Sequence, residues 1–121
     1  MTKPRVLIVD ASRESRDVLR TLLNRQGTET LETNEIVAAG AIADRERPDL
    51  IVCDADGDRS PANVATRLLA QQASRSAIPI VVLGTVRRDF KPLAGGDLVS
   101  KPYHYAPLIR KIERLLGTRT G

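Results

Sequence analysis

Short apolar runs alternate along the chain with longer segments in which apolar residues recur every three or four positions. The runs at residues 6–9, 50–53 and 80–83 consist of valine, isoleucine and leucine apart from one cysteine, which is typical of strands buried on both faces of a sheet. The intervening segments have the period of amphipathic helices. This alternation predicts parallel strands joined by crossover helices that cover the sheet.

Boundary signals define the first helices of this pattern. A helix is expected at residues 12–26, because Ser12 can cap its N-terminus and Gly27 suits the left-handed residue that follows a helix. A weak strand at residues 29–32 comes next, and Asn34 is placed to cap the second helix.

Two helices in the middle of the chain are each expected to bury an apolar stripe. The stripe of the helix at residues 34–47 consists of Ile36, Val37, Ala39 or Gly40, and Ile42 or Ala43. The following helix begins at Ser60-Pro61, where a missing proline N–H is harmless, and its stripe is Val64, Leu68 and Leu69.

The last third of the chain combines a weak segment with a strong one. Residues 84–96 contain few apolar positions, a proline and a pair of glycines, so any fourth helix there is short or irregular. A short strand precedes Lys101-Pro102, and a final amphipathic helix starts at Ala106 and ends at Gly117. The pattern predicts a single domain over residues 1–121, with a doubly wound five-stranded parallel sheet and helices on both faces.

The composition is that of a globular protein. Hydrophobic residues make up 41% and charged residues 28% of the 121 positions, which argues against disorder. No segment approaches the roughly 18 apolar residues of a membrane span, and no signal-peptide core precedes the first strand. The single cysteine, Cys53, lies in an apolar run and is expected to be a small buried residue in a reducing, cytoplasmic protein.

The formal net charge of +4 raises the question of nucleic-acid binding. The arginines are spread over the whole chain, and only Phe90, Tyr103 and Tyr105 are aromatic, so there is neither a basic patch nor a stacking surface. We expect no nucleic-acid partner for this domain alone.

Three charged residues follow predicted strands. Asp10, Asp54 and Lys101 each stand at or just after the end of one, and parallel strands bring such residues to one edge of the sheet. Carboxylates suit Mg²⁺, and a lysine ammonium pairs with phosphoryl oxygens. The sequence therefore predicts a site for a cation and a phosphoryl group.

Four segments together extend this prediction to a family. They are VLIVDAS at 6–12, PDLIVCDAD at 48–56, IPIVVLGT at 78–85 and SKPYHYAPLIRKIERLL at 100–116. Because these segments occur in this order and at this spacing, the chain resembles the bacterial response-regulator receiver domains, the CheY-like family, over nearly its full length. The resemblance implies the flavodoxin-like version of the doubly wound fold and a role in two-component signal transduction.

The resemblance also implies specific roles. Asp54 occupies the position of the phosphoryl acceptor, Asp10 that of a metal-binding acid, and Lys101 that of the phosphate-contacting lysine. Asp56 stands where the family uses a backbone carbonyl to bind the metal, which is Mg²⁺, and Lys101-Pro102 is expected to be cis. The implied partner is a histidine kinase or a phosphotransfer protein, with a second copy of the chain as a further candidate, and no external substrate is turned over.

Several signature positions depart from the family. Ala11 replaces a second acid after the first strand, Gly84 stands where a hydroxyl residue is usual, with Thr85 one place late, and Leu98 replaces an aromatic residue. Asp56 and Asp58 add charge to the acceptor loop and are candidate substitutes for the missing acid, although Asp58 stands at a usual proline.

These departures support an alternative function. The chain is then a pseudo-receiver that acts without phosphorylation, as a protein-interaction or dimerisation module.

Two other kinds of site are rejected. The loop that starts at Asp54 has its glycine at the wrong place for a calcium-binding EF-hand, and its twelfth position is Ala65 rather than an acid. The only histidine, His104, is expected to be a surface residue.

Overall fold

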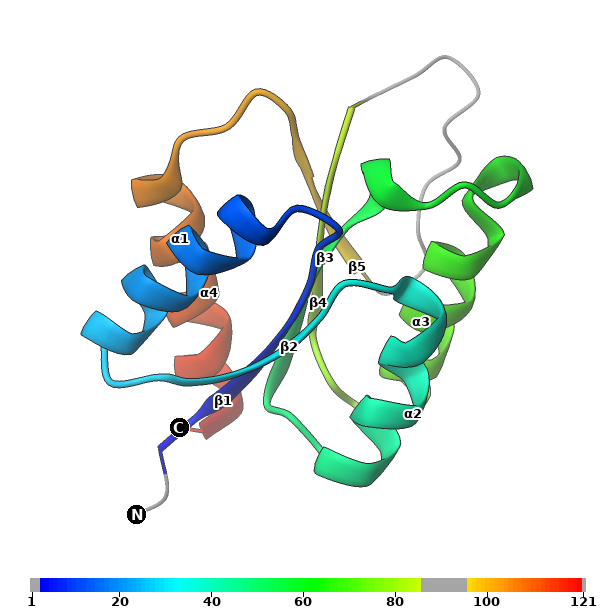
Figure 1. Cartoon of the computed structure of the whole chain (residues 1–121). Coiled ribbons are helices and arrows are strands. Elements are labelled where there is room, and N and C mark those ends of the chain that lie inside the picture. The colour runs from blue at the N-terminus through cyan, green and yellow to red at the C-terminus, as the bar shows by residue number, and fades with distance from the viewer. Residues whose placement is uncertain (1–2, 86–95, 121) are drawn as a thin grey trace.

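A computed structural model describes residues 3–85 and 96–120 of the chain. Five parallel strands form one sheet in the order β2-β1-β3-β4-β5 (Figure 1). The strands are β1 (Arg5–Val9), β2 (Glu29–Thr33), β3 (Leu50–Asp54), β4 (Ile80–Gly84) and β5 (Gly96–Ser100). This order is that of the flavodoxin-like fold and confirms the predicted fold class.

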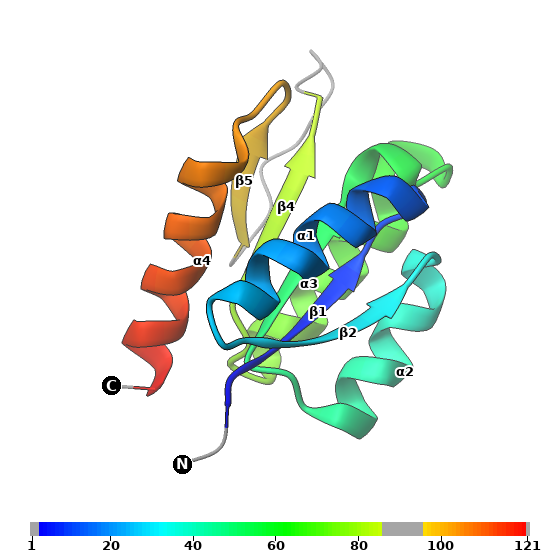
Figure 2. The same ribbon diagram turned by 60° about the vertical axis from the view of Figure 1, so that its left-hand side comes forward.

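Helices cover both faces of the sheet, as predicted. They are α1 (Arg13–Arg25), α2 (Ile36–Glu46), α3 (Val64–Arg75) and α4 (Tyr105–Thr120). Helices α1 and α4 lie on one face, while α2 and α3 lie on the other (Figures 1 and 2). The expected short or irregular helix within residues 84–96 falls almost entirely outside the described residues. None of the described helices is long and apolar enough to cross a bilayer.

The hydrophobic core has two parts, one on each face of the sheet. Strand β3 is buried along its whole length and contributes to both parts, because its side chains alternate between the faces. Ile51 and Cys53 pack beneath α2 and α3, whereas Leu50 and Val52 pack beneath α1 and α4. Strand β3 thus anchors the centre of the sheet, and its carboxyl end places Asp54 at the sheet edge.

Helix ends agree with the sequence at some positions and not at others. Ser12 caps α1 by accepting a hydrogen bond from the Ser15 amide, and Gly27 has φ +82°, as predicted. The N-cap of α2 is Glu35, so the expected Asn34 cap is wrong. Helix α4 continues to Thr120 rather than ending at Gly117, because a single glycine costs a helix only about 1 kcal/mol.

The predicted buried stripes of α2 and α3 are also partly wrong. Val37 is 86% exposed, Leu68 57% and Val64 43%. The other predicted positions are confirmed: Ala39, Ala43 and Leu69 are buried, and Ile36 and Ile42 pack partly buried against the same core. Ala70 and Ala73 complete the buried face of α3.

Candidate functional site

The carboxyl edge of the sheet brings distant residues together. Asp10 follows β1, Asp54 ends β3, and Lys101 follows β5. The Lys101 ammonium lies 2.7 Å from Oδ2 of Asp54, and the charges of both residues act on the Asp10 carboxyl. Asp10 is 3% exposed and Asp54 8%, so two acids sit largely out of water at this edge.

Asp10 has a carboxylate oxygen without a partner. Its Oδ1 accepts the Ser12 amide at 2.8 Å, and its backbone carbonyl accepts the Arg16 guanidinium at 2.7 Å. No described residue donates to the buried Oδ2. Burial, with a smaller contribution from the charge of Asp54, raises the pKa of Asp10 above its usual value. An unpaired buried oxygen of this kind suits a bound cation.

Lys101 joins two carboxylates. Besides Asp54, its ammonium lies 3.1 Å from Oδ2 of Asp56. Burial alone would lower the pKa of Lys101, but its hydrogen bonds to Asp54 and Asp56 outweigh burial and raise that pKa. Lys101 is therefore a fixed positive charge next to Asp54. Its peptide bond to Pro102 is cis, as the family resemblance implied.

The side chain of Asp56 accepts two hydrogen bonds from Thr85. Its Oδ1 accepts the Thr85 amide and its Oδ2 the Thr85 hydroxyl, both at 3.0 Å. Burial alone would raise the pKa of Asp56, but the hydrogen bonds from Thr85 and Lys101 lower it. Sequence reasoning missed this pair, although the extra acid at 56 and the hydroxyl displaced from 84 to 85 were visible signals.

Asp58 supports the start of α3. One of its oxygens accepts the amide and hydroxyl of Ser60, and Oδ2 accepts the amide of Thr66 at 2.8 Å and its hydroxyl at 2.7 Å. Burial alone would raise the pKa of Asp58, but these bonds lower it. Both oxygens are committed, so Asp58 is not the substitute metal ligand that its charge suggested.

The turn before α3 explains why these bonds are needed. Ala62 and Asn63 have φ values of +51° and +54°, so residues 61–63 form a separate turn and α3 starts at Val64, not at the predicted Ser60-Pro61. Ser60 still accepts the Ala65 amide at 3.0 Å. Together with Asp58 it supplies the side-chain caps of α3.

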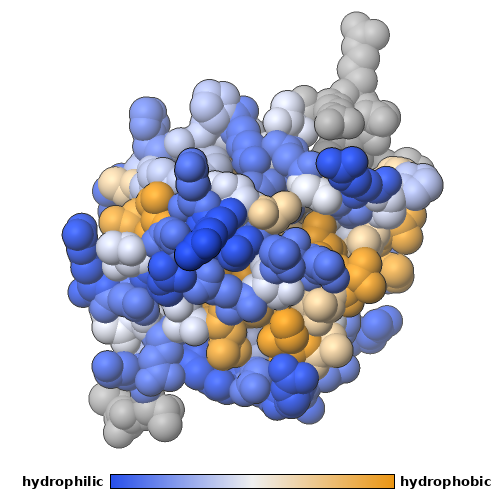
Figure 3. Space-filling view, in the orientation of Figure 1, coloured by the Kyte–Doolittle hydropathy of each residue, from blue (hydrophilic) through white to orange (hydrophobic). Residues whose placement is uncertain are grey.

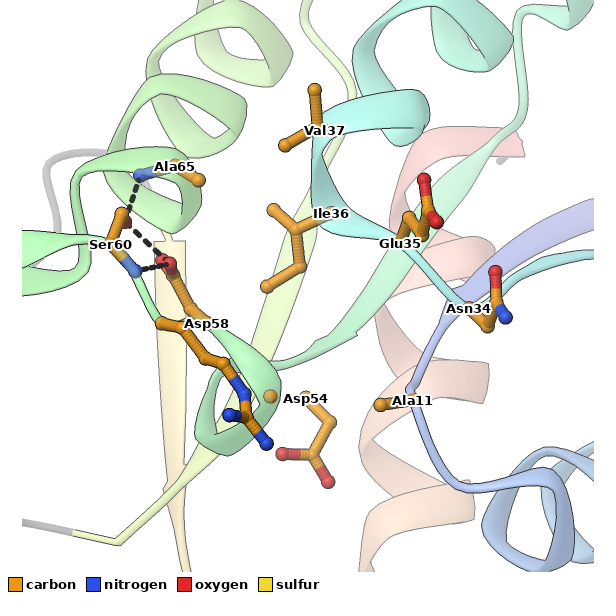
Figure 4. Close-up of a pocket in the computed structure, with 11 residues that line it drawn as sticks. Ala11, Asn34, Glu35, Ile36, Val37, Asp54, Asp58, Ser60 and Ala65 are labelled. Atoms are coloured by element: carbon orange, nitrogen blue, oxygen red, sulfur yellow. Dashed lines mark hydrogen bonds between the residues drawn. The ribbon is translucent and has the colours of Figure 1, made fainter.

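A cleft of about 300 Å³ opens on Asp54. Figure 4 shows the Asp54 carboxylate beside Ala11 at one end of this cleft, and Ile36 and Val37 from the start of α2 at the other. Ala11 contributes a methyl group where the family has an acid. Within the described residues, no three His, Cys, Asp or Glu side chains converge in a metal-binding arrangement, so any metal here depends on two carboxylates and backbone oxygen.

Comparisons with known proteins agree with the fold. No protein-family model matches the chain. The chain is 28% identical over 118 residues to Protein PilH of Pseudomonas aeruginosa, a response regulator, and the match covers 93% of this chain and 98% of PilH.

Solved structures of receiver domains share the fold. The receiver domain of a LuxO-type repressor from Vibrio parahaemolyticus superposes with a TM-score of 0.80 at 16% identity and covers 98% of this chain and 94% of that one. The receiver domain of the histidine kinase PA1611 from Pseudomonas aeruginosa, which holds a magnesium ion in its active-site cleft, gives 0.78 at 23% identity, covering 96% and 99%. The similarity to PilH over nearly the whole of both chains, together with the fold shared with these structures, supports the resemblance of this chain to the CheY-like receiver domains of two-component signalling.

Proposed function

We propose that this receiver domain, spanning residues 1–121, accepts a phosphoryl group on Asp54 from a histidine kinase or a histidine phosphotransfer protein. The observation that carries the proposal is the contact of 2.7 Å between the Asp54 carboxylate and the Lys101 ammonium, next to the unpaired oxygen of Asp10. A nucleophile, a fixed cation and a spare carboxylate oxygen are the groups that phosphoryl transfer to an acid requires.

In the proposed step, a carboxylate oxygen of Asp54 attacks the phosphorus of a phosphohistidine. The bond between phosphorus and the imidazole nitrogen breaks, the imidazole leaves with the electron pair, and an acyl phosphate forms on Asp54. Lys101 balances the charge that the phosphoryl group brings, and its second contact with Asp56 holds the ammonium in position. The domain turns over no external substrate in this role.

The site fits Mg²⁺ as the cofactor. Asp10 and Asp54 would supply carboxylate oxygens and Asp56 its backbone carbonyl, which matches the one or two carboxylates that Mg²⁺ takes from proteins. The unpaired buried Oδ2 of Asp10 is the feature of this chain that favours a cation. When bound, the metal supplies positive charge that stabilises phosphoryl oxygens. The buried thiol of Cys53 is compatible with a reducing cytoplasm, where we place this transfer.

Specific observations also favour the alternative of a receiver that works without phosphorylation. Ala11 supplies no carboxylate, and the Thr85 hydroxyl is engaged by Asp56 rather than by Asp54. In this role the domain would act through its surface alone, as a protein-interaction or dimerisation module.

Amide NMR spectra separate the two functions. Spectra are recorded with and without Mg²⁺ plus beryllofluoride, a phosphoryl mimic, for the wild type, Asp54→Asn and a matched carboxylate variant on α1, Asp17→Asn. Phosphorylation predicts shifts around residues 10, 54 and 101 in the wild type and Asp17→Asn, and none in Asp54→Asn. Unchanged wild-type spectra would refute acceptor function and leave the alternative.

A further inference from the structure

An apolar groove of about 190 Å³ runs between α2 and α3. The helices lie side by side, and the Gln72 amide donates to the Gly40 carbonyl at 2.8 Å and to the Asp44 carboxylate at 2.9 Å. Gly40 permits this approach, because a Cβ there would lie 2.6 Å from Oε1 of Gln72. The apolar walls of the groove are Ile36, Val37, Leu68 and Leu69.

The rim of this groove is unusually exposed. Val37 and Leu68 are the two most exposed large apolar side chains in the described part of the chain, at 86% and 57%, and Val64 on α3 adds a third at 43%. Figure 3 shows apolar side chains gathered on the side of the molecule where α2 and α3 lie. A contiguous apolar patch on a small protein marks a surface that another molecule covers.

The charges of the two helices are complementary. The segment at residues 35–47, which is α2 with both of its caps, has three acids and two arginines, whereas α3 has two arginines and no acid. Helix α2 therefore attracts a copy of α3. We propose that the occupant of the groove is a second copy of this chain, which packs its own α2-α3 face against it.

The direction of the helices selects the symmetry of this dimer. Ile36 and Ala65, near the starts of α2 and α3, line the same groove, and Gln72 bonds to Asp44 near their ends, so the helices run parallel. A twofold axis parallel to them places α2 of each copy on α3 of the other, with like ends together. An axis across the helices would instead place α2 on α2 and oppose acid to acid.

This symmetry pairs two particular residues. Asp44 lies one helical turn beyond Gly40, and Arg75 lies one turn beyond Gln72, so both continue the groove-lining faces of their helices. Both are exposed. In the dimer, Asp44 of each copy lies beside Arg75 of the other, and the contact occurs twice.

The size of the face predicts a weak dimer. Helices of 11 and 12 residues are only about 17 Å long, so two of them bury less than the roughly 800 Å² per partner of a standard interface. We expect a dissociation constant on the order of 100 μM. The groove shares Ile36, Val37 and Ala65 with the cleft that opens on Asp54, so the dimer borders the acceptor site.

Sedimentation equilibrium of the whole chain, from micromolar to about 1 mM, tests the dimer against this expected affinity. The wild type should pass from monomer to dimer over this range. Val37→Glu and Leu68→Glu should each weaken association by about tenfold or more, because they place a charge in the apolar contact. Val18→Glu is the matched control, since Val18 is an exposed valine on α1, and it should leave association unchanged.

Charge reversal gives a test that a fold defect cannot mimic. Asp44→Arg alone should weaken association by about tenfold, because two attractive pairs become repulsive. Adding Arg75→Asp should restore it. A wild type that stays monomeric, a dimer that survives Leu68→Glu, or a double variant no better than Asp44→Arg would each overturn the proposal.

Discussion

The buried carboxylate oxygen of Asp10 that has no hydrogen-bond partner leads to a quantitative prediction for the stability of the variant Asp10→Asn. Asparagine keeps the oxygen that accepts the Ser12 amide and removes a largely buried charge near Asp54. A buried polar atom without a partner costs about 1–3 kcal/mol. Part of this cost remains, because the asparagine amide also needs a partner. We therefore expect the free energy of unfolding at pH 7, without divalent cations, to rise by about 1 kcal/mol.

The assay is thermal unfolding followed by circular dichroism, with and without millimolar Mg²⁺. Without the metal, Asp10→Asn should melt about 3–5 °C above the wild type, the shift expected from about 1 kcal/mol in a domain of this size. With Mg²⁺ the wild type should gain stability and Asp10→Asn should gain much less, because the ligand that binds the native state is lost. A less stable Asp10→Asn, or equal stabilisation of both proteins by Mg²⁺, would refute this reasoning.

Three further predictions follow from other side chains. Asp58→Ala removes the acceptor of four hydrogen bonds and should lower the free energy of unfolding in urea by about 2–4 kcal/mol, whereas Asp97→Ala, at an exposed ion pair, should change it by less than about 1 kcal/mol. Burial raises the pKa of the Cys53 thiol to about 12, so a thiol reagent at pH 8 should label it only as fast as the protein unfolds; fast labelling of native protein contradicts this. Burial and the neighbouring Tyr105 raise the pKa of Tyr103 to about 12; in Tyr105→Phe burial remains, so the tyrosinate absorbance of Tyr103 should still appear above the usual value of about 10. Because the folded pKa exceeds the unfolded value of about 10, stability should fall with rising pH between these values, and Tyr103→Phe should lessen that fall.

The sheet could be predicted from the sequence because its central strands are apolar on both faces. Residues 50–53 are apolar without a break and must be buried on both sides. Once the strands are parallel, Asp54 and Lys101 necessarily reach the same edge. The contact between them is thus a consequence of topology, whereas their chemical roles rest on resemblance to a family.

The exposure of Val37 on α2 could not be predicted in the same way. The first eight residues of α2 are all apolar or glycine, so the period of apolar positions does not show which of them is left out of the core. Ala39 and Ala43 are buried and Ile36 and Ile42 pack against the core as predicted, whereas Val37 is exposed. Counting every large apolar side chain near the start of this helix as buried therefore wrongly included Val37.

Side-chain bonds in the acceptor loop were also beyond sequence reasoning. Asp58 reaches Thr66 only because the intervening turn has left-handed residues at 62 and 63, and nothing in the residue types required them, since alanine rarely adopts that conformation. Asp56 reaches Thr85 across 29 positions of sequence. Such contacts depend on the geometry of the loops. The sequence therefore shows that the loop has an extra acid, but it does not show which residue donates a hydrogen bond to that acid.

The most direct test of acceptor function is intact-protein mass spectrometry after incubation with acetyl phosphate and Mg²⁺. We expect one added phosphoryl group on the wild type and on Asp17→Asn, and none on Asp54→Asn or after chelation of the metal. A wild-type mass that does not change, or a phosphoryl group that persists in Asp54→Asn, would contradict this expectation.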